Sequence, residues 1–486
     1  MSAPGQIYRW LDDAVRSGGA QRSVDSQEAT LSRRGLLLRA DRRARELAGL
    51  RIGAGDVVAL SMGNVTEFLV LLLAVSKLGA VAMPVDPANG DRSLLGAAHR
   101  LPIRAVIRRP RGLDNSPLEY PEAYRLASRR KLSGSLLDLD ILEPSGAPHH
   151  GQALPTDVEF VFETAGADGT LRDVIRTGAQ IRGIGEGVRD LLSITAGTHI
   201  ACAQPLTSPR FFDPALFGWL ASEARLVIAD TPSVHALLPS HPAYERLLVV
   251  DLLHNLQAAA RTLKASGHPR ELTAVIPQAT IATAHAKALR QAFGEDPQQL
   301  LVLEEVGVLA ARTMKRGQSY QVAAGFALRP GDAHPDGGRE VLCRAPVTST
   351  TQPPTPGGQV GGDAGDGWIH TGYLGRWSAS GELTEVTGRS DRLVNLEGRR
   401  ASLDAIEAAI REHMRIVDAE AAVESDVDGN PYVHVYYQAT GQTELDDLDE
   451  HVVATLPPYM VPRLFTREDP EGDDEAEQAT ELGASS

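Results

Sequence analysis

Residues 55–87 constrain the fold more than any other stretch, because they alternate between short and longer apolar runs. Residues 55–62 predict a buried strand, and residues 65–78 are long and apolar enough for a helix. Gly79 is expected to end that helix, since glycine readily adopts the positive φ angle of a C-cap. Residues 80–87 then predict a second strand. A strand–helix–strand order of this kind indicates parallel strand pairing and an α/β fold.

The α/β pattern extends in both directions from this unit. Residues 28–50 and 181–192 predict helices, and residues 158–163 predict a strand. A second series of alternating strands and helices is expected over residues 197–310. By contrast, residues 108–158 are rich in proline, serine and arginine, so we expect irregular surface structure with short strands there.

The C-terminal part of the chain predicts a smaller module. Residues 348–367 form a loop rich in proline and glycine. Beyond it, helices are expected at residues 406–413 and 445–456, and strands at residues 419–423 and 432–438. This mixture indicates a small α+β domain after the large α/β part.

Bulk properties narrow the class of protein and its partners. At 486 residues the chain exceeds one ordinary hydrophobic core, so two or more domains are expected. A formal net charge of -15 argues against nucleic acid or an anionic membrane as the main partner. Only Cys202 and Cys343 are present, and no apolar signal segment opens the sequence. We therefore predict a cytoplasmic protein with no nucleic-acid and no membrane partner.

Four segments carry a resemblance to a known family. They are LLLAVSKLGAVAMPVDP (71–87), WIHTGYLGR (368–376), GRSDRLVNLEGRR (388–400) and LDAIE (403–407). Together they resemble the adenylate-forming superfamily, which contains acyl-CoA synthetases, luciferases and the adenylation domains of nonribosomal peptide synthetases.

The resemblance implies a division of the chain into domains. It places a large N-terminal domain, with parallel and mixed sheets and helices, over residues 1–387. A small α+β C-terminal domain follows over residues 388–466 and moves on a hinge near Asp391, while Gly398 lies on the side that admits a pantetheine thiol. Residues 467–486 are acidic, and we expect a disordered tail there.

Residues 164–173 fall where the family has its phosphate loop. Backbone N–H groups and one lysine of such a loop hold a triphosphate. This sequence keeps Thr164, Gly166 and Gly169, but it has Arg172 at the lysine position and Asp173 at the following glycine position. The Asp173 carboxylate would oppose a phosphate, so the resemblance implies a degenerate phosphate loop. The alternative is an ordinary strand-to-helix turn.

Tyr373 stands where the family has an aspartate that holds both ribose hydroxyls. A phenol cannot accept two such hydrogen bonds and fills the space of the sugar, so the resemblance implies a degenerate ribose site. Arg389 is retained and can pair with a phosphate or a carboxylate. His370 lies beside the altered position and is a candidate base. The alternative for His370 is a surface residue of a β-ribbon.

Residues 301–307 occupy the place of the family's adenine and magnesium motif. Glu305 matches the magnesium ligand, with a solvated glutamate as the alternative, and Leu301 replaces the aromatic residue that stacks on adenine. We expect Leu301 and Glu304 to contact a substrate. The family also uses a lysine near the C-terminus for adenylation, and no lysine follows Lys315. We therefore predict no metal site and no required cofactor, ATP and magnesium included.

Phe212 and Asp213 resemble a residue pair of amino-acid-activating domains, in which the aspartate holds the α-ammonium of the substrate. A carboxylate facing an ammonium group is a strong specificity contact. The alternative is a helix N-cap, because Asp213 precedes a proline.

The leading functional hypothesis is a divergent member of this family that has lost ATP-dependent adenylation. It would act on an amino-acid or acyl thioester, carried by CoA or by an acyl or peptidyl carrier protein, in acyl transfer or amide formation. Candidate catalytic residues are His370, Arg389 and Glu305. Two alternatives are an active ATP-dependent ligase for amino or carboxylic acids, with arginine replacing lysine, and a non-catalytic protein that docks to a synthetase complex.

Overall fold

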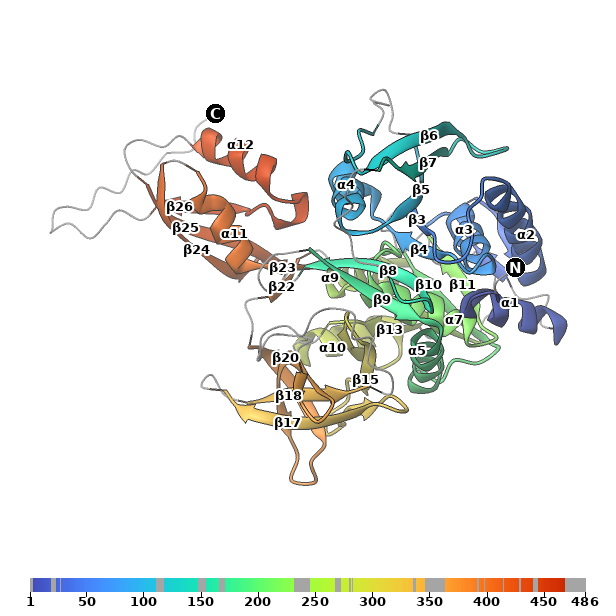
Figure 1. Cartoon of the computed structure of the whole chain (residues 1–486). Helices are drawn as coiled ribbons and strands as arrows, with labels where there is room; N and C mark the ends of the chain where they lie inside the picture. The colour runs from blue at the N-terminus through green and yellow to red at the C-terminus, as the bar shows by residue number, and fades with distance from the viewer. Residues whose placement is uncertain are drawn as a thin grey trace, which may run out of the picture.

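A computed structural model gives the structure of the chain (Figure 1). It describes residues 3–18, 23–26, 28–110, 118–146, 154–165, 171–230, 245–266, 272–278, 281, 283–334, 338–345, 363–390, 393–396, 398–413, 415–427, 430–439 and 445–467. The predicted positions Gly166, Gly169 and Asp391 lie outside these residues, as do the predicted tail and most of the Pro/Gly-rich loop.

A seven-stranded sheet carries the predicted strand–helix–strand unit. The strand order of this sheet is β6-β7-β5-β3-β4-β8-β9. Strand β3 pairs in parallel with both β4 and β5, and β4 pairs in parallel with β8. The strands are β3 (Val57–Ser61), β4 (Val81–Pro84), β5 (Ile103–Arg108), β6 (Tyr124–Lys131), β7 (Asp138–Pro144), β8 (Val158–Ala165) and β9 (Leu171–Thr177). The accompanying helices are α1 (Gln6–Arg16), α2 (Arg33–Gly49), α3 (Thr66–Lys77), η2 (Pro87–Asn89) and α4 (Gly90–Arg100). Gly79 has a φ angle of 66°, so it follows α3 as predicted.

A nine-stranded sheet forms the second layer of the large domain, in the order β16-β15-β14-β13-β12-β10-β11-β1-β2. Its strands are β1 (Ser23–Asp25), β2 (Thr30–Ser32), β10 (Thr198–Cys202), β11 (Arg225–Ile228), β12 (Arg246–Val250), β13 (Leu272–Ile276), β14 (Gln298–Leu303), β15 (Gly307–Thr313) and β16 (Gln321–Val322). Its helices are α5 (Gly178–Leu191), α6 (Pro209–Phe212), η3 (Asp213–Phe217), α7 (Gly218–Leu220), α9 (Leu253–Ser266) and α10 (Thr283–Phe293). Helices lie between β10 and β11, between β12 and β13, and between β13 and β14, as the second predicted series requires.

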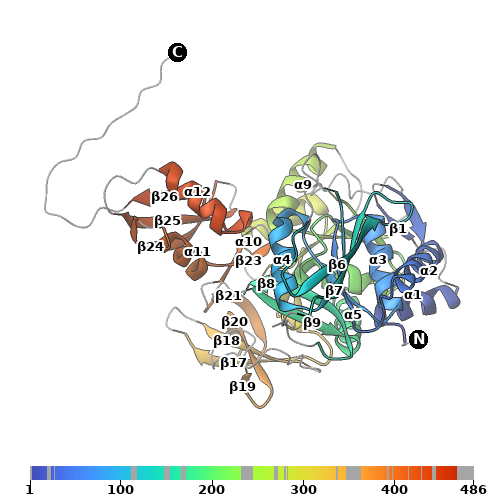
Figure 2. The same ribbon diagram turned by 45° about the horizontal axis from the view of Figure 1, so that its top comes forward.

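Two further parts complete the fold. A five-stranded sheet contains β17 (Ala327–Ala333), β18 (Arg339–Arg344), β19 (Asp363–Gly365), β20 (Trp368–Trp377) and β21 (Leu383–Arg389). The small C-terminal domain contains β22 (Leu393–Leu396), β23 (Arg399–Ser402), α11 (Leu403–Arg411), β24 (Ile416–Ser425), β25 (Pro431–Ala439), α12 (Leu445–Thr455), η4 (Pro458–Met460) and β26 (Leu464–Arg467). Figures 1 and 2 show this domain beside the large one, with β22 and β23 between them. The fold is therefore the predicted α/β architecture with a small α+β domain, and its boundary at residue 388 stays a prediction.

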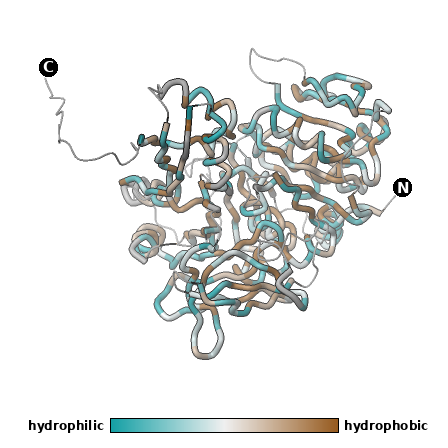
Figure 3. Tube along the Cα trace, turned by 60° about the vertical axis from the view of Figure 1, so that its left-hand side comes forward, coloured by the Kyte–Doolittle hydropathy of each residue, from teal (hydrophilic) through white to brown (hydrophobic). Residues whose placement is uncertain are grey.

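Hydrophobic packing separates the small domain from the large one. The largest core cluster joins both large sheets through residues such as Leu60, Phe160 and Ile200. The small domain has its own cluster, in which Ile406, Val435 and other apolar side chains pack together. In Figure 3 hydrophobic stretches run along the packed strands and helices. Among the described residues, no helix combines the length and hydropathy needed to cross a bilayer.

Two predictions about the first sheet were wrong. Residues 171–177 form strand β9, which pairs antiparallel with β8, so residues 164–165 and 171–173 belong to paired strands and the alternative of a strand-to-helix turn was wrong. Residues 108–158 include two long strands, and β7 is largely buried. Charged residues interrupt the apolar pattern of both strand pairs, and several of these charges form ion pairs in the fold, such as Arg129 with Asp140 and Arg176 with Asp213.

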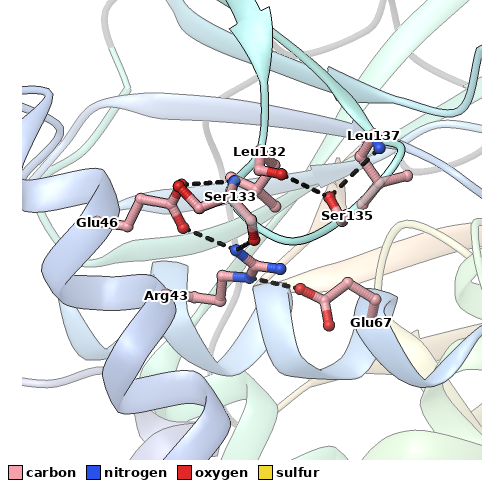
Figure 4. Close-up of polar contacts among 7 residues, drawn as sticks. All are labelled: Arg43, Glu46, Glu67, Leu132, Ser133, Ser135 and Leu137. Carbon is pink, nitrogen blue, oxygen red and sulfur yellow. Dashed lines mark hydrogen bonds and ion pairs between the residues drawn. The ribbon is translucent and has the colours of Figure 1, made fainter.

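Arg43 illustrates such a partnership (Figure 4). Its side chain is 2% exposed, and it contacts Glu67 of α3 at 2.5 Å and Glu46 at 2.7 Å. It also donates to the carbonyl oxygen of Ser133, between β6 and β7, at 2.7 Å. Arg43 of α2 thus fastens the β6–β7 hairpin to two helices.

Candidate functional site

A cavity of about 80 Å³ lies where the small domain meets the large one. Asp86 follows β4, Thr164 lies near the end of β8, and Glu304 follows β14. The cavity therefore lies at the carboxyl ends of strands from both large sheets, where open α/β folds commonly bind ligands. Lining residues from both domains include Asp86, Asn89, Ser93, Glu163, Thr164, Gln204, Phe211, Glu304, Gly398, Arg399 and Tyr459.

Glu304 is the central buried carboxylate of this cavity, with 3% of its surface exposed. Thr164 donates its hydroxyl to Glu304 Oε2 at 2.5 Å. Arg210 lies on the other side, with Nε and Nη2 both 3.4 Å from Glu304 Oε1, and it also donates to the carbonyl oxygen of Pro277. A buried carboxylate needs such donors, because burial without them is strongly unfavourable.

Arg100 neutralises a second pair of carboxylates at the edge of the cavity. Its Nη2 lies 2.6 Å from Glu163 Oε2 and 3.0 Å from Asp173 Oδ1. Ser93 donates to the other oxygen of Glu163 at 2.7 Å. Glu163 and Asp173 face each other across β8 and β9, so the hairpin register brings both to the same arginine. The Asp173 carboxylate is thus occupied by Arg100, while Arg172 lies opposite Thr164 on the neighbouring position.

Asp213 lies in the protein interior, outside the cavity lining. It forms an ion pair with Arg176 at 3.2 Å, and both side chains are 0% exposed. Burial raises the pKa of Asp213 to about 6, although the Arg176 guanidinium opposes the shift. Arg176 Nη2 also donates to the carbonyl oxygen of Glu304 at 2.6 Å, and Nη1 to that of Glu305 at 3.3 Å. The pair therefore supports the backbone that presents Glu304 to the cavity.

Phe212 packs beside this ion pair in an aromatic cluster. Its ring centre lies 4.9 Å from that of Phe162, 5.1 Å from that of Phe217 and 5.3 Å from that of Phe160. Asp213 begins the short helix η3 within a continuous helical segment, so it is not the N-cap that the alternative interpretation proposed.

Tyr373 fills its predicted position with a buried ring, 3% exposed. Its hydroxyl donates to the carbonyl oxygen of Val302 on β14 at 2.8 Å. The Arg389 guanidinium carbon lies 4.5 Å from the centre of the Tyr373 ring, and Arg389 Nη2 lies 3.4 Å from the carbonyl oxygen of Thr371. Leu301 belongs to the same apolar cluster as Tyr373. This region is a packed junction between β14 and β20.

Replacing Tyr373 with phenylalanine is expected to lower the free energy of unfolding by about 1–2 kcal/mol, because the Val302 carbonyl loses its buried donor. Denaturant unfolding monitored by circular dichroism measures the change. Tyr432→Phe is the matched control, since its hydroxyl bonds to Glu424 on an accessible sheet face. Equal stability of Tyr373→Phe and the unmodified protein would contradict the packing argument.

The residues predicted from the sequence thus fall into three groups. The cavity lining includes Thr164, Glu304 and Gly398. The buried support behind it includes Asp213, Phe212 and the backbone of Glu305. The β14–β20 junction contains Leu301, Tyr373, Arg389 and His370.

His370 has its own partner in that junction. Its Nδ1 lies 2.9 Å from Glu340 Oε2, on the neighbouring strand β18. The cavity described above draws its acidic groups from Asp86, Glu163 and Glu304, and its lining does not include His370, Arg389 or Glu305. Within the described ranges, no group of three or more His, Cys, Asp or Glu side chains is arranged to hold a metal ion.

The sequence did not identify Arg100, Arg176 and Arg210, the three arginines that pair with the buried carboxylates of the site. Only Arg176 could have been recognised from its sequence context, because it follows the apolar residues Val174 and Ile175 in a buried strand. A lone arginine in such a place implies a buried carboxylate partner. Arg100 and Arg210 lie on helices, and their sequence neighbours do not mark them.

The small domain closes the cavity through the turn between β22 and β23. Gly398 has a φ angle of 80°, and a Cβ atom there would lie 2.9 Å from the Phe211 ring. Arg399 forms an ion pair with Asp86, and its guanidinium carbon lies 5.1 Å from the centre of the Tyr459 ring. Arg92 of α4 donates to two carbonyl oxygens at the C-terminal end of α12, which the helix dipole favours.

Two larger cavities adjoin this closure. One of about 520 Å³ shares Asp86, Gln204 and Arg399 with the first cavity. Another of about 400 Å³ shares Gly398 and Tyr459 with it. The three cavities share these lining residues along the domain interface, and we refer to them together as the groove.

Comparisons with known proteins agree with this fold. The family model described as "AMP-binding enzyme" matches residues 11–303. Surfactin synthase subunit 3 of Bacillus subtilis (strain 168) is 24% identical over 493 residues, which cover 94% of this chain. The chain spans 37% of the length of that relative.

Two solved structures share the fold over nearly the whole chain. The o-succinylbenzoate CoA synthetase of Bacillus subtilis, bound to its product analogue OSB-NCoA, has a TM-score of 0.75 and 15% identity, covering 97% of this chain and 96% of that one. The amide bond synthetase McbA of Marinactinospora thermotolerans has a TM-score of 0.70 and 17% identity, covering 96% and 95%.

Proposed function

Because the chain belongs to the AMP-binding enzyme family, we propose that it acts on an amino-acid or acyl thioester without using ATP. The thioester would be carried by CoA or by an acyl or peptidyl carrier protein. The reaction would be amide formation or another acyl transfer. Similar folds include a synthetase bound to a CoA product analogue and an amide bond synthetase.

The observation that carries this proposal is the buried ring of Tyr373. The family resemblance assigns this position to an aspartate that holds the ribose. Here the phenol donates its only proton to the Val302 carbonyl and lies 3% exposed under Arg389. It offers no carboxylate to a sugar, and its ring packs into the apolar cluster that contains Leu301. Arg389 is itself stacked on that ring.

The charges around the cavity support the same proposal. Arg100 lies between Glu163 and Asp173, and Arg210 faces Glu304. These guanidinium groups already have carboxylate partners, so a triphosphate would have to displace those partners. Breaking a buried ion pair leaves an uncompensated charge, which is strongly unfavourable.

The groove along the domain interface supports a thioester as the ligand. It reaches the cavity beside Gly398, where the family resemblance places the pantetheine thiol. In amide formation the amine nitrogen attacks the thioester carbonyl carbon, a C–N bond forms and the C–S bond breaks. The proton released by the amine passes to the departing thiolate, so no further reactant is needed.

We expect no substrate-dependent exchange of pyrophosphate into ATP with a panel of amino and carboxylic acids, and no thermal stabilisation by ATP and magnesium. Acetyl-CoA and longer acyl-CoA thioesters are expected to bind and raise the melting temperature, since ligand binding stabilises the folded state. A known ATP-dependent adenylating enzyme serves as the assay control.

Exchange at ordinary enzyme rates would refute the proposal and establish the alternative of an ATP-dependent ligase with arginines in place of lysines. Absence of both ATP and thioester binding would favour the non-catalytic alternative. Co-purification with a synthetase would then be the next measurement.

A further inference from the structure

We propose that the cavity of about 80 Å³ binds the primary ammonium group of the amine that accepts the acyl group. This inference rests on the proposed function and names its acceptor. Its starting point is the set of hydrogen-bond acceptors that the cavity contains, which suits a cationic donor with several N–H groups.

The side-chain carbonyl oxygen of Asn89 is a hydrogen-bond acceptor for which the described residues supply no donor. Asn89 is the last residue of η2, which continues directly into α4, and its side chain forms no capping hydrogen bond. Its Oδ1 is buried, lines the cavity and has no hydrogen-bond partner within the described part of the chain. A buried carbonyl oxygen without a donor is unfavourable, so a ligand N–H at this point would remove the penalty.

Two carboxylates lie on the same cavity. Glu304 Oε1 faces two donors of Arg210, whereas Oε2 has one described donor, the hydroxyl of Thr164. Each oxygen of Glu163 has one described donor, from Ser93 or Arg100. A carboxylate oxygen can accept two hydrogen bonds, so Glu304 Oε2 and both oxygens of Glu163 can each accept one more donor.

Carboxylates outnumber cations in the lining of the cavity. The lining contains three carboxylates, from Asp86, Glu163 and Glu304, and one guanidinium group, from Arg399. An ammonium group in the cavity is therefore attracted by its lining, whereas an anionic ligand is repelled. Charge-assisted hydrogen bonds to carboxylates are also stronger than neutral ones.

The size of the cavity limits the group that enters it. A volume of about 80 Å³ exceeds the roughly 10–15 Å³ that one water molecule requires. It suits an ammonium group with a short unbranched chain. The remainder of a longer amine can extend into the adjoining cavity, which shares Asp86 and Arg399 with this one. A carboxylate of the cavity can then take the proton that converts the ammonium group into a nucleophilic amine.

The test measures binding of propylammonium to the full chain by ligand-observed NMR, with propan-1-ol and acetate as isosteric comparisons. Propylammonium is expected to bind saturably, and the alcohol and the carboxylate at least roughly tenfold more weakly. Asn89→Ala is expected to weaken propylammonium binding by roughly tenfold or more. Its melting temperature should stay the same or rise, because the substitution removes an unpaired buried acceptor.

Asn395→Ala is the matched control. Its amide atoms are also buried without a described partner, but Asn395 lines the cavity of about 400 Å³ and not the cavity of about 80 Å³. Propylammonium affinity should not change in that variant. Unchanged affinity in Asn89→Ala, or equal binding of alcohol and ammonium, would overturn the inference.

The result is distinguishable from failure of the proposed function. If propylammonium does not bind and ATP exchange is also absent, only the amine assignment fails. If ATP exchange is observed, the proposed function fails whatever the amine result.

Discussion

Replacing Arg176 with alanine is expected to lower the free energy of unfolding by about 3–5 kcal/mol, the range for removing one partner of a buried ion pair. Both members of the Arg176–Asp213 pair are 0% exposed, so water cannot replace the lost guanidinium. The substitution also removes the donors to the Glu304 and Glu305 carbonyl oxygens. We therefore expect the cavity to lose its order along with the stability.

Denaturant unfolding at pH 7 measures this effect, with Arg189→Ala as the matched control. Arg189 also pairs with an aspartate, but that ion pair is exposed on α5 and should contribute little. Combining Arg176→Met with Asp213→Leu should recover part of the loss, because apolar residues often replace a buried ion pair without penalty. Equal stability of Arg176→Ala and Arg189→Ala would show that the pair has no structural role.

Apolar patterning explains which parts of this fold could be predicted. Helix α3 and its flanking strands β3 and β4 lie inside the predicted ranges, because their apolar residues are contiguous and Gly79 marks the end of the helix. Strand β9 was missed, since Arg172, Asp173 and Arg176 interrupt its apolar residues. Those charges become compatible with a strand only through partners from distant segments, such as Arg100 and Asp213.

The same limit applies to the candidate site. Thr164 and Glu304 were predicted as site residues from family position, and they line one cavity, but their hydrogen bond joins residues 140 positions apart. The sequence could not reveal that Asp213 of η3 faces Arg176 of β9. Nor could it reveal that the hydroxyl of Tyr373 reaches the Val302 carbonyl. Such pairings depend on how two sheets pack, and local residue patterns do not encode that packing directly.

Replacing Gly398 with alanine is expected to weaken acyl-CoA binding by at least roughly tenfold. A positive φ angle in a residue with a side chain carries a penalty of about 1–2 kcal/mol, and the new methyl group would lie 2.9 Å from the Phe211 ring and 3.3 Å from Leu252. The turn between β22 and β23 must then move away from Phe211, which opens the groove at Gly398, where two of the cavities meet. Calorimetric titration with acyl-CoA measures the affinity.

Gly381→Ala separates the backbone penalty of a positive φ angle from the steric contact of the new methyl group. Gly381 has a similar φ angle of 82°, but no atom lies within 4 Å of its Cβ position. This variant should show the backbone penalty in stability without a loss of affinity. Phe211→Leu combined with Gly398→Ala should restore part of the binding, since the smaller side chain removes the contact. If Gly398→Ala binds acyl-CoA normally, the turn does not close over the ligand, and the thioester must enter by another route. A loss in Gly398→Ala alone ties thioester binding to the contact between the two domains.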